Sequence, residues 1–117
     1  MSGPDKELVI KPWGSEKIWA KTDKYVGKLM TIHAGKRMSL QYHENKEETI
    51  YVLSGCLKLW TEKDNENFLV LGPGQTYHVK PGSVHRFGAD LTQDVVLIEV
   101  STPELDDVIR LEDDYGR

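Results

Sequence analysis

Two histidines, one glutamate and one glutamine have the spacing of a metal site in this sequence. Gln41 and His43 stand at alternate positions of an expected strand, so their side chains point to the same face. Glu48 opens the next expected strand, and His85 opens another after a tight turn at Pro81. Two imidazoles, a carboxylate and an amide oxygen suit Mn, Fe, Co, Ni or Zn, and they leave coordination positions for water or substrate. We therefore predict one divalent transition metal ion on Gln41, His43, Glu48 and His85.

The prediction depends on the combined spacing of these residues. A strand histidine taken alone is more often a packed or surface residue than a metal ligand, and this alternative stays open for His43. A closed structural zinc site would more often use cysteines, and the chain has a single cysteine, Cys56. With one cysteine no internal disulfide can form, so a reducing compartment fits best and we expect a cytoplasmic protein.

The elements that must position these residues are short strands. Glycine, proline, asparagine and aspartate separate short apolar stretches at close spacing, as in an all-β sandwich or barrel. We expect strands at residues 16–21, 25–32, 39–43, 49–54, 56–62, 67–71, 76–79, 85–88 and 95–101. Residues 1–10 are expected to form a flexible N-terminal segment. The acidic stretch after Pro103 predicts either a short C-terminal helix or an extended tail.

Length and charge narrow the function classes. A chain of 117 residues allows one domain, residues 1–117. Its 15 basic and 19 acidic residues give a net charge of −4. Without a basic cluster, binding to nucleic acid or to an anionic membrane is not expected. The polar start lacks the apolar core of a signal peptide, and no apolar run is long enough to span a bilayer.

The same residues resemble a known superfamily. Gly35-x5-Gln41-x-His43-x4-Glu48-x6-Gly55 resembles the first cupin motif, and Gly74-x5-Lys80-x-Gly82-x2-His85 resembles the second. Many cupins have a histidine at the position of Gln41 and a proline at that of Lys80. The resemblance implies a single-domain cupin, a double-stranded β-helix or jelly-roll barrel whose four ligands point inward. It also makes a homodimer the expected assembly, because small cupins often pair.

A narrower resemblance covers residues 11–117. Four short segments and the ending resemble the type II phosphomannose isomerases: Lys11-Pro12-Trp13-Gly14, Ser39-Leu40-Gln41-Tyr42-His43, His85-Arg86-Phe87, Ile98-Glu99-Val100, and 106–117. In that family the domain often follows a mannose-1-phosphate guanylyltransferase. The glycine loop that would cradle a nucleotide phosphate is absent from these residues, so guanylyl transfer is not expected. The resemblance implies interconversion of mannose 6-phosphate and fructose 6-phosphate.

The chain departs from the family near the expected metal. Lys46 stands where the family usually has an arginine, and Thr49 stands where it has a histidine. A family asparagine after the last ligand histidine is also missing, and Gly88-Ala89-Asp90 stands there. Two alternatives to the isomerase follow: a sugar- or small-molecule-binding cupin without catalysis, and a different metal-dependent cupin enzyme such as an oxygenase.

An aldose–ketose isomerase also needs a base and a cation for the phosphate. Candidate catalytic residues are His78, Glu99 and Lys28, and candidate substrate-binding residues are Lys28, Arg86, Arg110 and Lys46. Each has a structural alternative. His78 and Glu99 could lie on the outer face of their strands, and Arg86 could pair with the acidic tail, because strand alternation points it away from His85. Lys28 shares its strand face with Met30 and Ile32, so it should point inward and need an anionic partner.

Overall fold

The computed structural model describes residues 8–64 and 66–117, which form eleven strands and no helix. The strands are β1 (Leu8–Lys11), β2 (Gly14–Lys21), β3 (Val26–Ile32), β4 (Leu40–Tyr42), β5 (Glu48–Ser54), β6 (Leu57–Trp60), β7 (Leu69–Leu71), β8 (Thr76–Val79), β9 (Arg86–Ala89), β10 (Val95–Ser101) and β11 (Ile109–Glu112). The all-β prediction is confirmed for the described residues.

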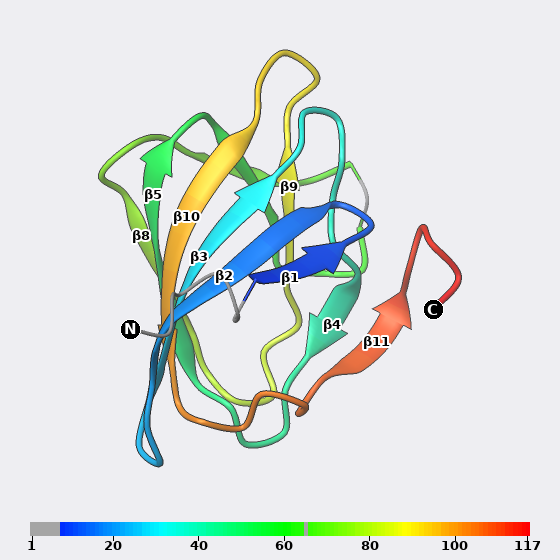
Figure 1. The fold of residues 1–117 in the computed structure, drawn as a ribbon. Helices are drawn as coiled ribbons and strands as arrows, with labels where there is room; N and C mark the ends of the chain where they lie inside the picture. Colours follow the sequence, from blue (N-terminus) through cyan, green and yellow to red (C-terminus); the bar gives the residue numbers. More distant parts are fainter. Residues whose placement is uncertain (1–7, 65) are drawn as a thin grey trace.

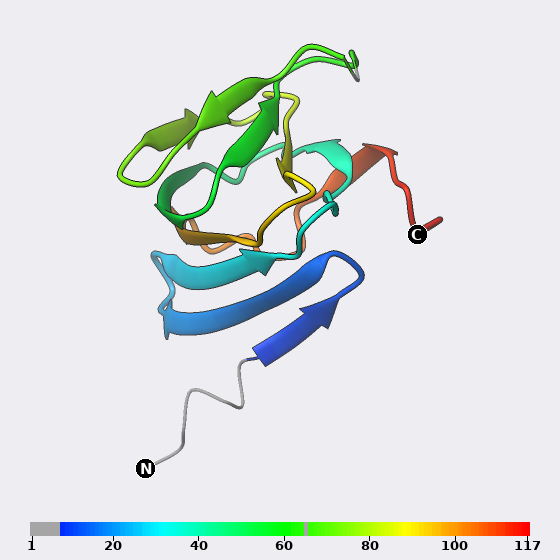
Figure 2. The same ribbon diagram turned by 90° about the horizontal axis from the view of Figure 1, so that it is seen from above.

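The strands pair antiparallel in three groups that surround one interior (Figures 1 and 2). A six-stranded sheet has the order β1-β2-β3-β10-β5-β8, and β7-β6-β9 and β11-β4 form the other two groups. Backbone bridges Arg37–Gly88 and Gln41–His85 join the segment before and within β4 to that around β9. Segments far apart in sequence thereby meet at one end of the barrel, where the expected metal ligands lie.

Strand alternation decides which side chains enter the interior. In β3, Met30 and Ile32 are buried, and the same face carries Lys28. In β10, Leu97 is buried and Glu99 shares its face. The apolar core fills one part of the barrel, and its members include Trp13, Met30, Ile50, Leu59, Phe87 and Leu97. The inward charged side chains lie in the other part.

Gly55 shows why a particular residue is needed at one turn. Its φ of 82° is in the left-handed region, and a Cβ there would lie 2.3 Å from the backbone oxygen of Asp94. Only glycine fits a turn that combines this conformation with so close an approach. The turn carries the chain from β5 into β6.

The N-terminal end of the chain differs from the sequence prediction, and the tail takes one of its two predicted forms. Leu8–Lys11 forms β1, so the flexible segment expected over residues 1–10 is wrong for residues 8–10, and residues 1–7 lie outside the described part. The tail takes the extended alternative and not the helix, because β11 pairs with β4 through Ile109↔Tyr42 and Arg110↔Gln41. In Figure 1, β11 runs beside β4 at the edge of the barrel. Among the described residues, no helix is long and apolar enough to cross a membrane.

Candidate metal centre

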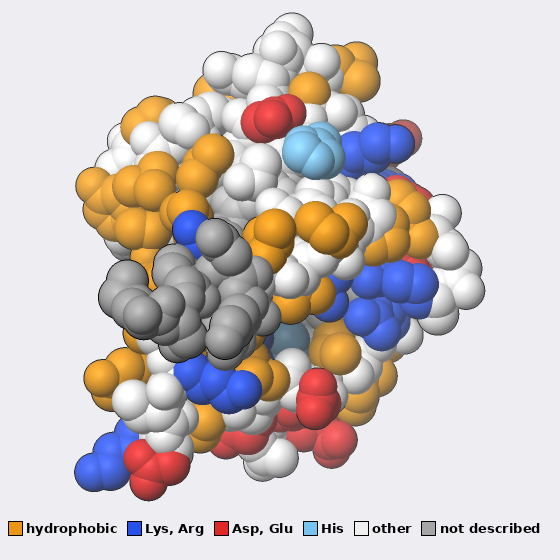
Figure 3. Space-filling model, viewed as in Figure 1, with side chains coloured by type: hydrophobic (Ala, Val, Ile, Leu, Met, Phe, Trp, Pro, Cys, Tyr) orange, Lys and Arg blue, Asp and Glu red, His pale blue; other side chains and the backbone are white. Residues whose placement is uncertain are grey.

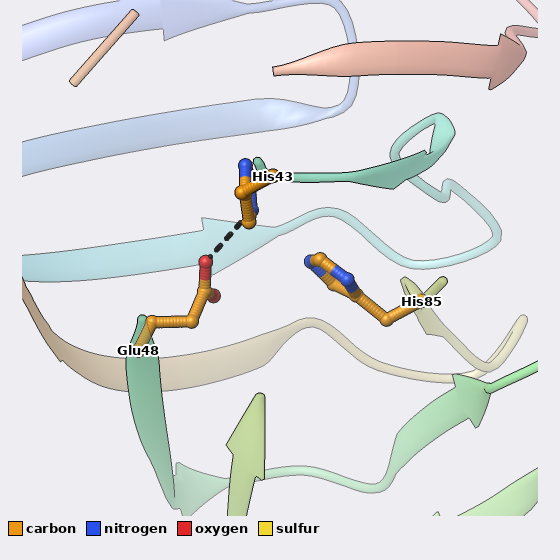
Figure 4. A group of neighbouring side chains, drawn as sticks. All are labelled: His43, Glu48 and His85. Atoms are coloured by element: carbon orange, nitrogen blue, oxygen red, sulfur yellow. Dashed lines mark ion pairs between the residues drawn. The ribbon is translucent and has the colours of Figure 1, made fainter. Parts of the chain in front are cut away.

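Three of the four expected ligands converge inside the barrel. His43 follows β4, Glu48 is the first residue of β5, and His85 immediately precedes β9. One ligand atom from each lies within 4.8 Å of the other two (Figure 4). The three residues are 4%, 3% and 1% exposed, so the cluster is shielded from bulk water.

Hydrogen bonds to backbone carbonyls set the tautomers of both imidazoles. His43 Nδ1 lies 2.5 Å from the carbonyl oxygen of Asp107, and His85 Nδ1 lies 3.0 Å from that of Ser83. A carbonyl oxygen can only accept, so each Nδ1 carries a hydrogen, and in the neutral form of each ring Nε2 presents a lone pair. Outer contacts of this kind orient histidines that bind a metal through the other nitrogen.

Both Nε2 atoms are buried and have no hydrogen-bond partner among the described residues. His43 Nε2 lies 2.9 Å from Oε1 of Glu48, at ion-pair distance but without hydrogen-bond geometry. A neutral nitrogen lone pair that faces a carboxylate oxygen is repelled by it unless a cation lies between them. Unpaired buried polar atoms are costly, so this arrangement fits a metal ion on His43, Glu48 and His85.

The electrostatics of the site favour the metal-binding protonation states of Glu48 and His85. Burial opposes ionisation of Glu48, but the Lys46 ammonium favours it, and the pKa of Glu48 lies below its usual range. Burial lowers the pKa of His85, so its imidazole is neutral at pH values where an exposed histidine is partly protonated. An ionised carboxylate and neutral imidazoles are the forms that bind metals.

Gln41 lies next to this cluster, and its backbone exchanges two hydrogen bonds with that of His85, at 2.9 and 3.0 Å. Its side chain lines the same cavity as His43 and Glu48. The carboxamide nitrogen donates to Sδ of Met38 at 3.1 Å, which leaves the oxygen available as a ligand. Coordination by Gln41 stays a prediction.

A cavity of about 270 Å³ is lined by His43 and Glu48 of this cluster, and its wall is rich in charge. The charged residues that line it are Lys11, Glu16, Lys28, Lys46, Glu48, Glu99, Asp106, Arg110 and Arg117. On the face shown in Figure 3, Lys and Arg side chains gather over the region of β1, β4 and β11. The cavity therefore combines a buried cluster of metal-binding atoms with surface cations.

The deep part of the cavity holds buried charges of alternating sign. Lys28 Nζ lies 3.1 Å from Oε1 of Glu16, and Lys46 Nζ lies 3.4 Å from Oε1 of Glu48 and 3.2 Å from Oε2 of Glu99. Burial raises the pKa of Glu99, and the nearby Glu48 carboxylate raises it further against the opposing Lys46 and Lys28 ammonium groups. Glu99 therefore holds a proton more readily than an ordinary glutamate does.

Four candidate residues lie where the sequence reasoning placed them. Glu99, Lys28, Lys46 and Arg110 all line the cavity, and the first three are buried. The anionic partner that Lys28 needed in the interior is Glu16, a residue that the sequence reasoning did not single out. The signal was available, because Glu16 and Ile18 share a strand face of β2 that is buried in the structure.

Two candidate residues lie elsewhere, and their expected roles must be corrected. The side chain of His78 is 46% exposed and pairs with Glu47, so it cannot reach the cavity as a base. Arg86 is 1% exposed, and its Nε donates to the carbonyl oxygen of Met38 at 2.9 Å. One of its terminal nitrogens donates to the carbonyl oxygen of Glu112 at 3.1 Å, so Arg86 anchors the tail, which was the structural alternative.

The sequence reasoning missed cavity residues from both ends of the chain. Lys11 comes from β1, which was not expected as a strand, and Arg117 comes from the last position of the tail. Asp107, whose carbonyl oxygen orients His43, was seen only as one of several tail acids. Alternation within Leu8–Lys11 was a weak signal for Lys11, whereas the position of Asp107 depends on a distant contact with the loop after His43.

Comparison with known proteins identifies the family. The family described as mannose-6-phosphate isomerase C-terminal matches residues 4–113. The chain belongs to this family. It is 34% identical over 112 residues to the alginate biosynthesis protein AlgA of Pseudomonas aeruginosa and 31% identical over 112 residues to the mannose-1-phosphate guanylyltransferase of Escherichia coli. Each match covers 93% of this chain and 23% of the relative, so the chain spans about a quarter of the length of these proteins.

Solved structures establish the cupin fold for this family member. A protein from Klebsiella pneumoniae with a double-stranded β-helix domain has a TM-score of 0.74 at 18% identity, over 94% of this chain and 95% of that one. The polyketide cyclase RemF of Streptomyces resistomycificus has a TM-score of 0.77 at 20% identity, over 95% of this chain and 84% of that one. At these identities the likeness concerns the fold alone, and it confirms the expected cupin barrel.

Proposed function

We propose that this chain is a metal-dependent sugar-phosphate isomerase that interconverts mannose 6-phosphate and fructose 6-phosphate. The observation that carries the proposal is the pair of buried, unpartnered Nε2 atoms of His43 and His85 beside the Glu48 carboxylate, in a cluster of which His43 and Glu48 line a charged cavity. Membership of the isomerase C-terminal family supports the substrate pair. The metal is one divalent transition ion, held by these three residues with Gln41 as the proposed fourth ligand.

The reaction moves a proton between C1 and C2 of the open-chain sugar. When bound, the metal ion would polarise the sugar oxygens and stabilise negative charge on them. We assign the proton transfer to Glu99, which lines the cavity and whose raised pKa suits a group that accepts and returns a proton near neutral pH. The Lys46 ammonium, 3.2 Å from Oε2, orients this carboxylate.

Cations at the cavity supply the phosphate contact in this proposal. Arg110 lines the cavity and is exposed, so its guanidinium is accessible to a ligand. Lys11 and Arg117 line the same cavity from the two ends of the chain. An arginine fork matches phosphate geometry, so Arg110 takes the phosphate role that Arg86, which anchors the tail, does not fill. Lys28, held by Glu16, faces the sugar deeper in the cavity.

A second candidate function is binding of a sugar phosphate without turnover. Lys46 stands in place of the family arginine, and its ammonium is held by Glu48 and Glu99. A lysine has a single ammonium group, whereas the planar guanidinium of an arginine has five N–H donors and could bind substrate while it pairs with these carboxylates. An oxygenase on the same barrel is the third alternative, and its dependence on oxygen distinguishes it.

The test is a coupled assay of mannose 6-phosphate conversion to fructose 6-phosphate. The protein is stripped of metal and reloaded with Mn, Co, Ni or Zn in turn. We expect metal-dependent turnover without oxygen, its loss in Glu48→Gln, a large decrease in kcat in Glu99→Gln, and no change in the control His78→Ala. Metal-loaded protein that is thermally stabilised by sugar phosphate but does not turn over would favour the binding function.

We further propose that the chain acts as a cytoplasmic homodimer. Within the described part of the chain, β1 pairs only with β2, which leaves its other edge unpaired. Leu8 and Ile10 on this strand are 50% and 74% exposed, and exposed apolar edge strands are commonly covered in native assemblies. Light scattering should give twice the chain mass, and a monomer at micromolar concentration would refute the dimer.

A further inference from the structure

Asp107 makes an unusual set of contacts with the loop that joins His43 to Glu48, which we call the ligand loop (residues 43–48). Its carboxylate accepts hydrogen bonds from the backbone N–H groups of Glu44 at 2.9 Å, Asn45 at 2.7 Å and Lys46 at 2.9 Å. Its own carbonyl oxygen lies 2.5 Å from His43 Nδ1. One residue of the tail therefore contacts four successive residues of the ligand loop.

These contacts constrain the backbone of the loop at three successive residues. A carboxylate that accepts backbone N–H groups forms charge-assisted hydrogen bonds, which are shorter and stronger than neutral ones. The three N–H groups also hold the pKa of Asp107 below its usual range, so the carboxylate stays ionised across the neutral and mildly acidic range. Among the described residues, no other carboxylate is recorded with three backbone donors.

The loop held in this way carries two residues of the proposed site. His43 at its start supplies a ligand nitrogen, and the ring orientation of His43 follows from the bond to the Asp107 carbonyl oxygen. Lys46 near its end places its ammonium between Glu48 and Glu99. A shift of the loop would move both groups relative to Glu48, which is fixed in β5.

We propose that Asp107 is a positioning residue for the metal centre. Asp107 holds the ligand loop so that His43 Nε2 faces Glu48 and His85. The proposal rests on the metal site of the proposed function. It gives the tail a role in assembling the site, because Asp107 lies between β10 and β11.

The tail has separate anchors, which make this role testable. Arg37 Nε donates to Asp114 Oδ2 at 2.7 Å, and the hydroxyl of Tyr115 donates to the carbonyl oxygen of Arg37 at 2.8 Å. Arg86 holds the carbonyl oxygen of Glu112. Removal of the Asp107 side chain should therefore loosen the ligand loop without releasing β11 from β4.

The experiment compares Asp107→Ala and Asp107→Asn with the control Asp94→Ala. Asp94 also accepts a backbone N–H, that of Ala34 at 2.9 Å, but it does not line the cavity. For each variant, Co²⁺ affinity is measured by competition with a chromophoric chelator, together with the visible spectrum of bound Co²⁺. The thermal midpoint of the metal-free protein reports the general loss of stability.

We expect Asp107→Ala to bind Co²⁺ about 10–100-fold more weakly than the wild type, as for other residues that orient metal ligands. The spectrum should change as His43 moves, and Asp107→Asn, which keeps one acceptor oxygen, should lie between the two. Asp94→Ala should lower the thermal midpoint without changing affinity. If Asp107→Ala does not fold, Asp107→Asn carries the comparison.

Two results would overturn the role of Asp107 and leave the metal site in place. Folded Asp107 variants with wild-type affinity and spectrum would show that the ligand loop does not need Asp107. An equal loss of affinity in Asp94→Ala would show that any loss of stability weakens the site. Wild-type protein that binds no Co²⁺ would instead overturn the metal site itself and the role of Asp107 with it.

Discussion

Replacement of Lys46 by methionine should destabilise the metal-free protein strongly. Lys46 is 5% exposed, and its ammonium lies 3.2 Å from a Glu99 oxygen and 3.4 Å from a Glu48 oxygen. At an effective dielectric constant of about 20, each contact is worth about 5 kcal/mol of Coulomb energy, which burial of the charges offsets by several kcal/mol per ion. Removing one partner leaves the two carboxylates uncompensated, so we expect Lys46→Met to cost about 3–5 kcal/mol.

The loss of folding stability in Lys46→Met should increase with pH. Burial and Glu48 already raise the pKa of Glu99, and Lys46 opposes that rise. Without the ammonium, the folded-state pKa of Glu99 rises further above its unfolded value. The folded variant then binds more protons than the unfolded chain, so its stability falls as pH increases through the raised pKa. The penalty should be larger at pH 8 than at pH 5.5.

Urea unfolding followed by tryptophan fluorescence measures this free energy. Total stability for a domain of this kind is about 5–15 kcal/mol, so the expected loss is a large part of it. The control Lys36→Met changes an exposed lysine and should stay within about 0.5 kcal/mol of the wild type. A loss below about 1 kcal/mol for Lys46→Met at pH 8 would refute the buried charge network.

Three further predictions concern residues outside this network. Gly55→Ala should lower the free energy of unfolding by roughly 2–4 kcal/mol, because the positive φ of Gly55 and the nearby Asp94 oxygen leave no room for a Cβ. A near-native melting temperature in thermal unfolding would contradict this prediction. His78→Ala should leave metal affinity unchanged and lower the free energy of unfolding by no more than about 1 kcal/mol, since the pair of His78 with Glu47 is exposed. Loss of bound metal in this variant would show that His78 contributes to metal binding. Arg86→Leu should lower the free energy of unfolding by about 3 kcal/mol, because it removes two hydrogen bonds to backbone carbonyls. Amide hydrogen exchange should become faster selectively in β11. Unchanged protection of these amides would show that Arg86 does not anchor the tail.

The convergence of His43, Glu48 and His85 was predictable because their positions depend on local rules. Strand alternation places Gln41 and His43 on one face, and a short connection brings Glu48 back beside them. His85 follows a proline–glycine turn that the sequence marks clearly. Strand alternation also predicts that His78 faces outward, because it alternates with the apolar residues Tyr77 and Val79, and it does face outward in β8.

The tail was not predictable because its structure depends on distant contacts. Acidic residues after Pro103 are compatible with a helix start, and nothing local indicates that Ile109 will pair with Tyr42. The burial of Arg86 under the tail follows from this pairing. So does the contact between Asp107 and the ligand loop, which joins residues more than sixty positions apart in the chain. Local patterns therefore predicted the clustered side chains, whereas the parts of the chain that orient them required the assembled barrel.

The most direct test of this account is the metal stoichiometry of the purified chain after stripping and reloading with Co²⁺ or Zn²⁺, measured by elemental analysis. We expect one ion per wild-type chain and none in the double variant His43→Ala/His85→Ala, with His78→Ala retaining the wild-type value as the control. Unchanged stoichiometry in the folded double variant would contradict the metal centre on His43, Glu48 and His85, and the proposed isomerase with it.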